Sequence, residues 1–318
     1  MRVLVLAPLL MFFAAGALGQ VYPAKPVRII VAQAAGGASD LLIRVIAQKL
    51  TENLGQTFII DNRPGAGGNV GAEIAAKSPA DGYTLFMLSA PHTIAPSLYR
   101  KLSYDVLRDF TPVTPLGSEP LCAVVHPSIP VKTVREFAAF LKQRPRQVSY
   151  GSSGNGAVNH LATELFKSRA GVDMVHVPYK GSAAAIPDAI SGVVPVLFAN
   201  VSPLLPHVRA GKLRALAVTS LERVRVLHEV PTFAESGYPG YDAVNWFSMA
   251  APARSPDDIV RKLNAAFTQT LTMPAMREYY ESRGANVTVG TPDEMRSYIQ
   301  SEVQKWAAVV RASGARVD

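Results

Sequence analysis

The chain has very little cysteine and no dense cluster of positive charge. Among its 318 residues Cys122 is the one cysteine, which excludes an internal disulfide and a cysteine-based zinc site. The formal net charge of +8 is spread along the chain, without a Lys/Arg block that interleaves with aromatic residues. Nucleic-acid binding therefore has no support in the sequence. The six histidines are scattered without the spacing of metal ligands, so we expect neither a metal nor another cofactor.

Nucleotide-binding motifs are also missing. The sequence contains no Walker A motif. The glycine-rich segment 65–71 has Val70 where a dinucleotide fingerprint needs its last glycine. No paired carboxylates stand out for acid–base chemistry, because the acidic residues at predicted helix starts are explained as caps.

One loop carries the types of residue that an enzyme would need. The loop 151–155 resembles a nucleophile elbow, but Asn155 stands in place of the last glycine. A hydrolase that uses Ser152 or Ser153 with His160 remains an alternative, to be tested by turnover of esters. Without an activated nucleophile or a metal set, the sequence favours a binding protein over an enzyme.

The N-terminus has the organisation of a secretory signal peptide. Arg2 supplies a short positive region, residues 3–18 are almost entirely apolar, and Ala17-Leu18-Gly19 places small residues at the positions that a signal peptidase reads. The alternative, a membrane anchor, is disfavoured because the apolar run is short. We therefore expect a signal peptide at 1–19. A secreted chain without disulfides is more typical of the bacterial periplasm than of a small extracellular scaffold.

A strand, a glycine turn and a helix are predicted in the first part of the mature chain. Ile29–Val31 is apolar throughout, as in a strand buried on both faces. Gly36 and Gly37 form the turn, and Ser39 or Asp40 can cap a helix that runs to residue 55. Such a turn directs free N–H groups and a helix dipole at one point, where a small anion could bind. An ordinary strand-to-helix turn is the alternative.

The rest of the chain repeats the alternation of strand and helix. This alternation is typical of an α/β protein with parallel strands and right-handed crossovers. A proline-rich region at 112–130 and another crossing at 231–240 divide the pattern into two lobes, the first of them discontinuous. We predict a first lobe at 20–122 and 236–318 and a second lobe at 123–235. Further strands are predicted at 57–61, 83–89, 122–125, 148–150, 175–177, 193–198, 214–219 and 245–251.

Several motifs together resemble one family, the substrate-binding proteins of tripartite tricarboxylate transporters, also called the Bug family. They occur in order along the whole mature chain, and together they are highly specific. The matching segments are 63–72, 81–85, 150–156 followed by His160-Leu161, 177–182, and 237–241 followed by Trp246 and 251–252.

The resemblance implies a fold and a function. The fold is a type II periplasmic binding protein, in which two α/β lobes, each a mixed or mostly parallel sheet flanked by helices, enclose a ligand cleft. The ligand is a small organic anion such as a di- or tricarboxylate, and the partners are membrane transporter subunits or, alternatively, a sensor kinase. The resemblance also implies a periplasmic location, a monomer and the absence of catalysis.

The resemblance also implies a set of ligand-binding residues. One ligand carboxylate is held at the first strand–helix turn and at the serine-glycine turn of the second lobe, and two later segments contribute further contacts. Two departures from the family pattern occur: Ala34-Ala35 replaces a proline before the paired glycines, and Ala199 replaces an acid, which disfavours an amino-acid ligand. The implied residues are Ala35, Gly36, Gly37, Ser39, Asp40, Ser152, Ser153, Gly154, Asn155, Tyr179, Lys180, Gly181, Ala199 and Asn200.

Overall fold

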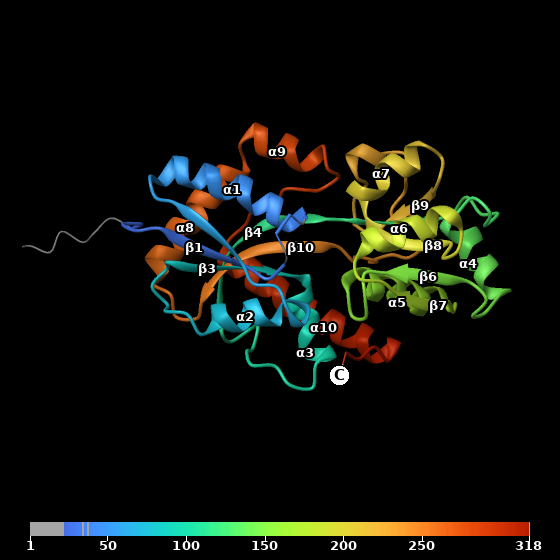
Figure 1. Ribbon diagram of the computed structural model, residues 1–318, viewed down its shortest axis with the longest axis horizontal. Helices are drawn as coiled ribbons and strands as arrows, with labels where there is room; N and C mark the ends of the chain where they lie inside the picture. The colour runs from blue at the N-terminus through green and yellow to red at the C-terminus, as the bar shows by residue number, and fades with distance from the viewer. Residues whose placement is uncertain (1–21, 34, 37, 318) are drawn as a thin grey trace, which may run out of the picture.

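Two five-stranded sheets, each flanked by helices, lie end to end in the molecule (Figure 1). The computed structural model describes residues 22–317 except 34 and 37, so the predicted signal peptide at 1–19 lies outside the described residues. Within the described residues, no helix combines the length and the apolarity needed to cross a membrane.

The first sheet has the order β2-β1-β3-β10-β4. Strands β1, β2 and β3 are parallel, whereas β10 runs antiparallel to both β3 and β4. Side chains alternate between the two faces, so Ile29 and Leu85 pack on one side and Ile30 and Phe86 on the other. The strands are β1 (Val27–Val31), β2 (Phe58–Asn62), β3 (Thr84–Ser89), β4 (Phe110–Glu119) and β10 (Asn245–Pro252).

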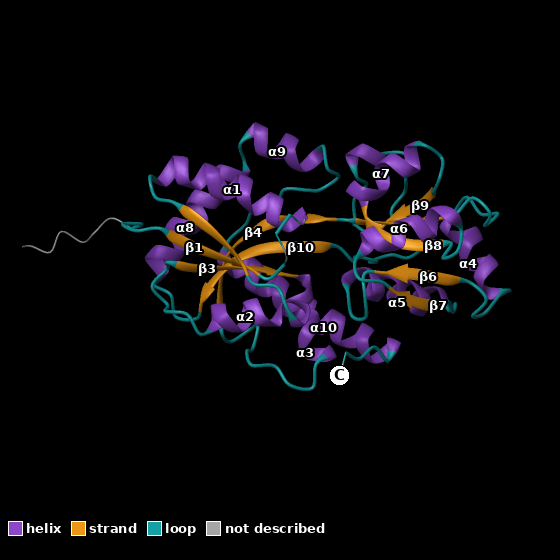
Figure 2. Ribbon diagram, in the orientation of Figure 1, coloured by secondary structure: helices purple, strands orange, loops and turns teal. Residues whose placement is uncertain are grey.

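Helices cover both faces of this sheet (Figure 2). One face packs against α1 (Ala38–Leu54), α8 (Asp257–Leu271) and α9 (Pro274–Glu281). The other face packs against α2 (Asn69–Ala76), α3 (Ala90–Leu98) and α10 (Pro292–Ser313), with the short 3-10 helix η1 (Ala66–Gly68) before α2. Coverage on both faces explains why the central strands β1, β3 and β10 are mostly apolar.

The second sheet has the order β7-β6-β8-β5-β9. Strand β6 is parallel to β7 and β8, and β5 is antiparallel to β8 and β9, so this sheet is mixed as well. The strands are β5 (Leu121–Val125), β6 (Ser149–Ser152), β7 (Val175–Pro178), β8 (Val196–Asn200) and β9 (Arg214–Val218). The helices are α4 (Val134–Lys142) and α5 (Val158–Ala170) on one face, α6 (Ser182–Ser191) and α7 (Val201–Arg209) on the other, and the 3-10 helix η2 (Arg225–Leu227).

The chain passes between the sheets twice. The first passage is at Pro120, between β4 and β5, so the predicted lobe limit at 122 falls two residues into β5. The return passage lies between β9 and β10, and the predicted limit at 236 falls inside it. The lobes also touch where α10 packs on α5. In the return passage, the Tyr241 hydroxyl donates a 2.6 Å hydrogen bond to the Ala162 carbonyl in α5.

Among the strands and α-helices of the described residues, four were not indicated by the sequence patterns: β4, α3, α7 and α9. Three of them contain prolines, which argue against a regular strand or helix in a reading of the sequence alone. Pro112 and Pro115 lie in β4, where they are tolerated because β4 is an edge strand with irregular register. Pro96 lies within α3 and Pro206 within α7. The expectation that Cys122 is a buried apolar residue is confirmed, since it has no exposed surface.

Candidate functional site

The turn between β1 and α1 is held by Asp40. Its carboxylate accepts hydrogen bonds from the Gly36 N–H (2.9 Å), from Arg44 Nε (2.8 Å) and from Asn62 Nδ2 (2.9 Å). Burial alone would raise the pKa of Asp40, but the bonds from Arg44, Gly36 and Asn62 outweigh it and hold this pKa below the usual value. Asp40 is 1% exposed. Its charge is therefore already paired inside the first lobe, with Arg44 and with the N–H of the turn.

The other predicted residues of this turn differ in exposure. Ala35 and Gly36 are exposed, and Ser39 is buried in the first turn of α1. Gly36 has φ +83, and a Cβ built on it would meet nothing within 4 Å, so backbone conformation requires glycine here, not lack of space. Gly37 lies outside the described residues. Helix α1 begins at Ala38, so Ser39 and Asp40 lie within its first turn and neither is the residue before it.

Two polar residues that the sequence patterns did not single out lie next to this turn. Gln33 follows β1 and Ser89 ends the neighbouring strand β3, and Gln33 Nε2 lies 3.4 Å from Ser89 Oγ. The Oε1 atom of Gln33 is buried and has no hydrogen-bond partner among the described residues. Both residues lie at the carboxyl ends of parallel strands, where open α/β sheets bind ligands.

The serine-glycine turn of the second lobe follows β6. The Gly154 N–H donates to Ser152 Oγ (3.1 Å), and the N–H and hydroxyl of Ser153 both lie within 3.2 Å of Asn159 Oδ1. Asn159 Nδ2 in turn donates to the Phe198 carbonyl at the end of β8. Asn155 is the exposed residue of the turn. Asn159, in the first turn of α5, thus ties the turn to two strands, a role that no sequence motif indicated.

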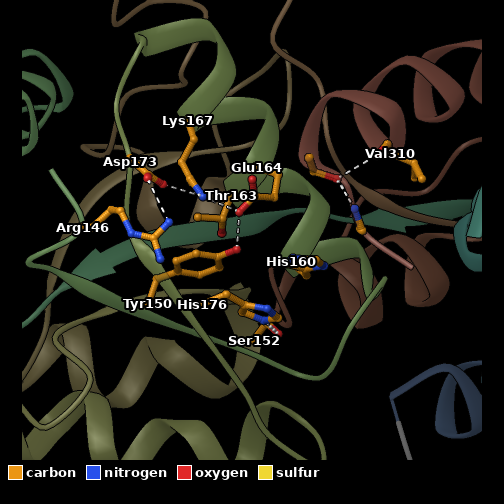
Figure 3. Close-up of polar contacts among 12 residues, drawn as sticks. Arg146, Tyr150, Ser152, His160, Thr163, Glu164, Lys167, Asp173, His176 and Val310 are labelled. Carbon is orange, nitrogen blue, oxygen red and sulfur yellow. Dashed lines mark hydrogen bonds and ion pairs between the residues drawn. The ribbon is translucent and has the colours of Figure 1, made fainter. Parts of the chain in front are cut away.

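Two histidines lie beneath the same turn (Figure 3). Ser152 Oγ is 2.6 Å from His176 Nε2, and His160 Nδ1 accepts a 3.0 Å hydrogen bond from the Gly156 N–H. The structure therefore pairs Ser152 with His176 and not with His160. Ser152 has no exposed surface, so its hydroxyl is closed to a substrate. This arrangement gives no support to the hydrolase alternative.

The segment after β7 contributes a second polar group. The Tyr179 N–H donates to the Ser152 carbonyl (3.0 Å), and the Tyr179 hydroxyl donates to Asp188 Oδ2 (2.6 Å). Burial and the hydrogen bond to Asp188 raise the pKa of Tyr179 to about 12, so its hydroxyl stays protonated. Lys180 is exposed, and Gly181 directly precedes α6 with φ +102.

The last two predicted residues lie at the end of β8 and differ from one another. Ala199 has no exposed surface and packs against apolar side chains of the second lobe, including Cys122. Asn200 Nδ2 donates a short hydrogen bond to Glu119, the last residue of β4. Glu119 and Asn200 therefore connect the two lobes beside Pro120. The structure brings Asn200, but not the side chain of Ala199, to the junction of the lobes.

Two cavities lie near this junction. A small one of about 110 Å³ is formed where Leu42 in α1 and Ser202 in α7 approach each other, with Glu119 in its wall. A larger one of about 830 Å³ lies beside β4 and β10, and no predicted site residue lines it. In the described part of the chain, no group of histidine, cysteine or acidic side chains is arranged to hold a metal.

Comparison with known proteins gives one consistent result. The family model described as the tripartite tricarboxylate transporter family receptor matches residues 42–315. Protein BugT from Bordetella pertussis is 40% identical, over 93% of this chain and 91% of that protein. The structure of R. palustris Rpa4515 with adipate is 38% identical, with a TM-score of 0.81 over 93% of this chain and 100% of that one. The structure of MatC from Rhodopseudomonas palustris with bound malate is 31% identical, with a TM-score of 0.77 over 91% and 100%.

Proposed function

The chain belongs to the tripartite tricarboxylate transporter receptor family, and on this premise we propose that it captures a small di- or tricarboxylate, or a related organic acid, between its two lobes. Members of this family are periplasmic solute-binding receptors and not enzymes, so the hydrolase alternative is set aside. One observation carries the ligand class. Two structures with the same fold, at 38% and 31% identity, hold adipate and malate, and both of these are dicarboxylates.

The proposed site comprises polar turns at the carboxyl ends of strands from both lobes. Its first half is the exposed turn at Ala35 and Gly36, and its second half is the turn around Asn155 with Ser153. Helices α1 and α5 begin at these turns, and a helix N-terminus stabilises an anion through its N–H groups and dipole. Contacts from both lobes make the closed arrangement the one that ligand favours.

We propose that the ligand lacks an ammonium group. The carboxylate of Asp40 already pairs with Arg44, and Ala199 supplies no charge. Malate and aspartate differ by a hydroxyl in place of an ammonium and so form a matched pair. We expect malate to bind more tightly, and tighter binding of aspartate would contradict this part of the proposal.

Calorimetric titration of the purified protein tests the ligand class. The panel consists of adipate, malate, succinate and citrate, with hexanoate as the control that keeps the length of adipate and loses one carboxylate. We expect a dissociation constant of about 1 μM or tighter for at least one member, and binding of hexanoate at least about 100-fold weaker. Absence of binding by every di- and tricarboxylate tested would refute the proposed function.

Two further parts of the proposal concern the location and the partner. We propose export to the periplasm with removal of residues 1–19, which N-terminal sequencing of the protein from a periplasmic fraction tests. We also propose that the partner is a membrane transporter. Deletion of the gene should then abolish uptake of the bound carboxylate, whereas a sensor kinase as partner would leave uptake intact and remove a transcriptional response.

A further inference from the structure

The amides on either side of Asn155 point into the second lobe. The Gly154 N–H donates to Ser152 Oγ (3.1 Å), and the Gly156 N–H donates to His160 Nδ1 (3.0 Å). Both glycines have positive φ, +129 and +73, which an L side chain rarely adopts. The turn therefore depends on two inward hydrogen bonds and on two glycines whose backbone conformation a residue with a Cβ would adopt only under strain, one bond and one glycine on each side of Asn155.

Two stacked imidazole rings lie beneath the turn and support its inward hydrogen bonds (Figure 3). The ring centroids of His160 and His176 lie 4.0 Å apart with an interplanar angle of 11°, and His176 Nε2 lies 2.6 Å from Ser152 Oγ. The Tyr150 ring lies near both, with its centroid 5.0 Å from that of His176 and 6.4 Å from that of His160. His160 comes from α5, His176 from β7 and Tyr150 from β6, so three elements fix the rings in place.

His160 must carry no proton on Nδ1 to accept the hydrogen bond from Gly156. Burial, with His176 and Lys167 nearby, lowers the pKa of His160 to about 3. Burial lowers the pKa of His176 as well. At neutral pH both rings are therefore uncharged, and His160 Nδ1 is an acceptor beneath the turn.

Because the neighbouring amides are bonded inward, the N–H of Asn155 is the amide of this turn that can contact a ligand. The N–H of Ser153 is engaged by Asn159, and those of Gly154 and Gly156 are engaged as above. Asn155 is exposed, and among the described residues no group accepts a hydrogen bond from its N–H. It is thus the residue of this turn that is free to donate to a ligand.

We propose that His160 and His176 are positioning residues that hold the second-lobe turn so that Asn155 is presented to the ligand carboxylate. This inference rests on the proposed function, because it names the device that orders one half of the proposed site. Neither histidine touches the ligand. Each acts through the turn, His160 directly on the Gly156 amide and His176 through the hydroxyl of Ser152.

Substitutions that keep or remove the acceptor atom test the inference. His160→Asn keeps an acceptor near the position of Nδ1, and His176→Gln keeps a polar atom near the position of Nε2, whereas His160→Leu and His176→Leu remove them. His228→Leu, at an exposed histidine, is the control. We expect each Leu variant to weaken dicarboxylate binding by about tenfold or more, as when a buried amide loses its acceptor, and the Asn and Gln variants to stay within about threefold of the parent protein.

Amide exchange in the ligand-free protein gives a second readout. By NMR, we expect the Gly156 amide to exchange about tenfold faster in His160→Leu, and the Gly154 amide to do so in His176→Leu, with other core amides unchanged. If the parent protein binds no carboxylate, the proposed function fails and this exchange measurement alone decides the inference. Folded Leu variants with parental affinity and protected glycine amides would overturn it.

The nitrogen shifts of the parent protein keep the inference testable even if the Leu variants do not fold. At pH 7 we expect the 15N shift of His160 Nδ1 to be that of an unprotonated acceptor, with a coupling across the hydrogen bond to the Gly156 N–H. A protonated Nδ1 would overturn the inference.

Discussion

Because of Glu119, the free energy of unfolding of the protein should fall as the pH rises from 4.5 to 7. It ends β4 beside Pro120, is 6% exposed, and accepts a hydrogen bond from Asn200 in the other lobe. No cation forms an ion pair with it among the described residues. Burial raises the pKa of Glu119 to about 7, against the opposing effect of the Asn200 hydrogen bond.

The size and the sign of the effect follow from proton linkage. Between pH 4.5, the ordinary value for a glutamate, and pH 7 the folded protein holds a proton that the unfolded chain has released. The free energy of unfolding therefore falls as pH rises, by ~1.4 kcal/mol per pH unit, or by about 3 kcal/mol over this range. Glu119→Gln keeps an oxygen that accepts from Asn200 and carries no charge. We expect the variant to be about 3 kcal/mol more stable than the parent at pH 8 and equal to it near pH 4.5.

Urea unfolding at half-unit steps from pH 4.5 to 8 measures this difference. The buried histidines titrate equally in both proteins, so their contribution cancels in the difference between the curves. Glu278→Gln, at an exposed glutamate of α9, controls for the loss of one carboxylate. A difference between Glu119→Gln and parent that does not change with pH, or that grows toward low pH, would refute the reasoning.

Three smaller predictions concern contacts within and between the lobes. A Cβ on Gly156 would lie 2.3 Å from a methyl of Leu98 and φ is +73, so Gly156→Ala should cost about 2 kcal/mol in urea unfolding, and Leu98→Ala should recover part of that cost. Asp40→Asn should cost about 2 kcal/mol at pH 7, because charged hydrogen bonds are lost, and this cost should fade below about pH 4, where a carboxyl of depressed pKa gives up its stabilisation. Arg225→Ala breaks an ion pair with Glu281 in which the arginine side chain is 79% exposed. The free energy of unfolding should therefore change by no more than about 0.5 kcal/mol, and a larger change would show that this contact holds the lobes together.

The fold was predictable where apolar runs and turn residues agree. Ile29–Val31 forms the core of β1, and Gly55 follows the end of α1 with φ +68, as the pattern indicates. Strand β4 was not predictable because its prolines argue against a strand, and the fact that makes them acceptable, an edge position paired to β10, is a property of the complete sheet.

The candidate site was predictable in its turns but not in the partners that hold them. The sequence pattern predicts Asp40 as a helix cap. In the structure, one of its carboxylate oxygens pairs with Arg44 and the other accepts a hydrogen bond from Asn62, in the next strand. His160 lies near the start of α5 and His176 lies in β7, and their rings stack because α5 packs on the sheet in which β7 pairs with β6. Such pairings depend on register between strands, which a single sequence does not reveal.

Strand β10 has a consequence for the order in which the chain can fold. It lies between β3 and β4, although more than a hundred residues separate it from either strand in the sequence. A growing chain therefore carries a first sheet that lacks β10, the strand joining β3 to β4, until residue 252 has been made. The second sheet, in contrast, comes from the uninterrupted stretch 121–218. The lobe that is made second can thus be the first to complete its sheet, and the lobe that begins the protein must wait for its end.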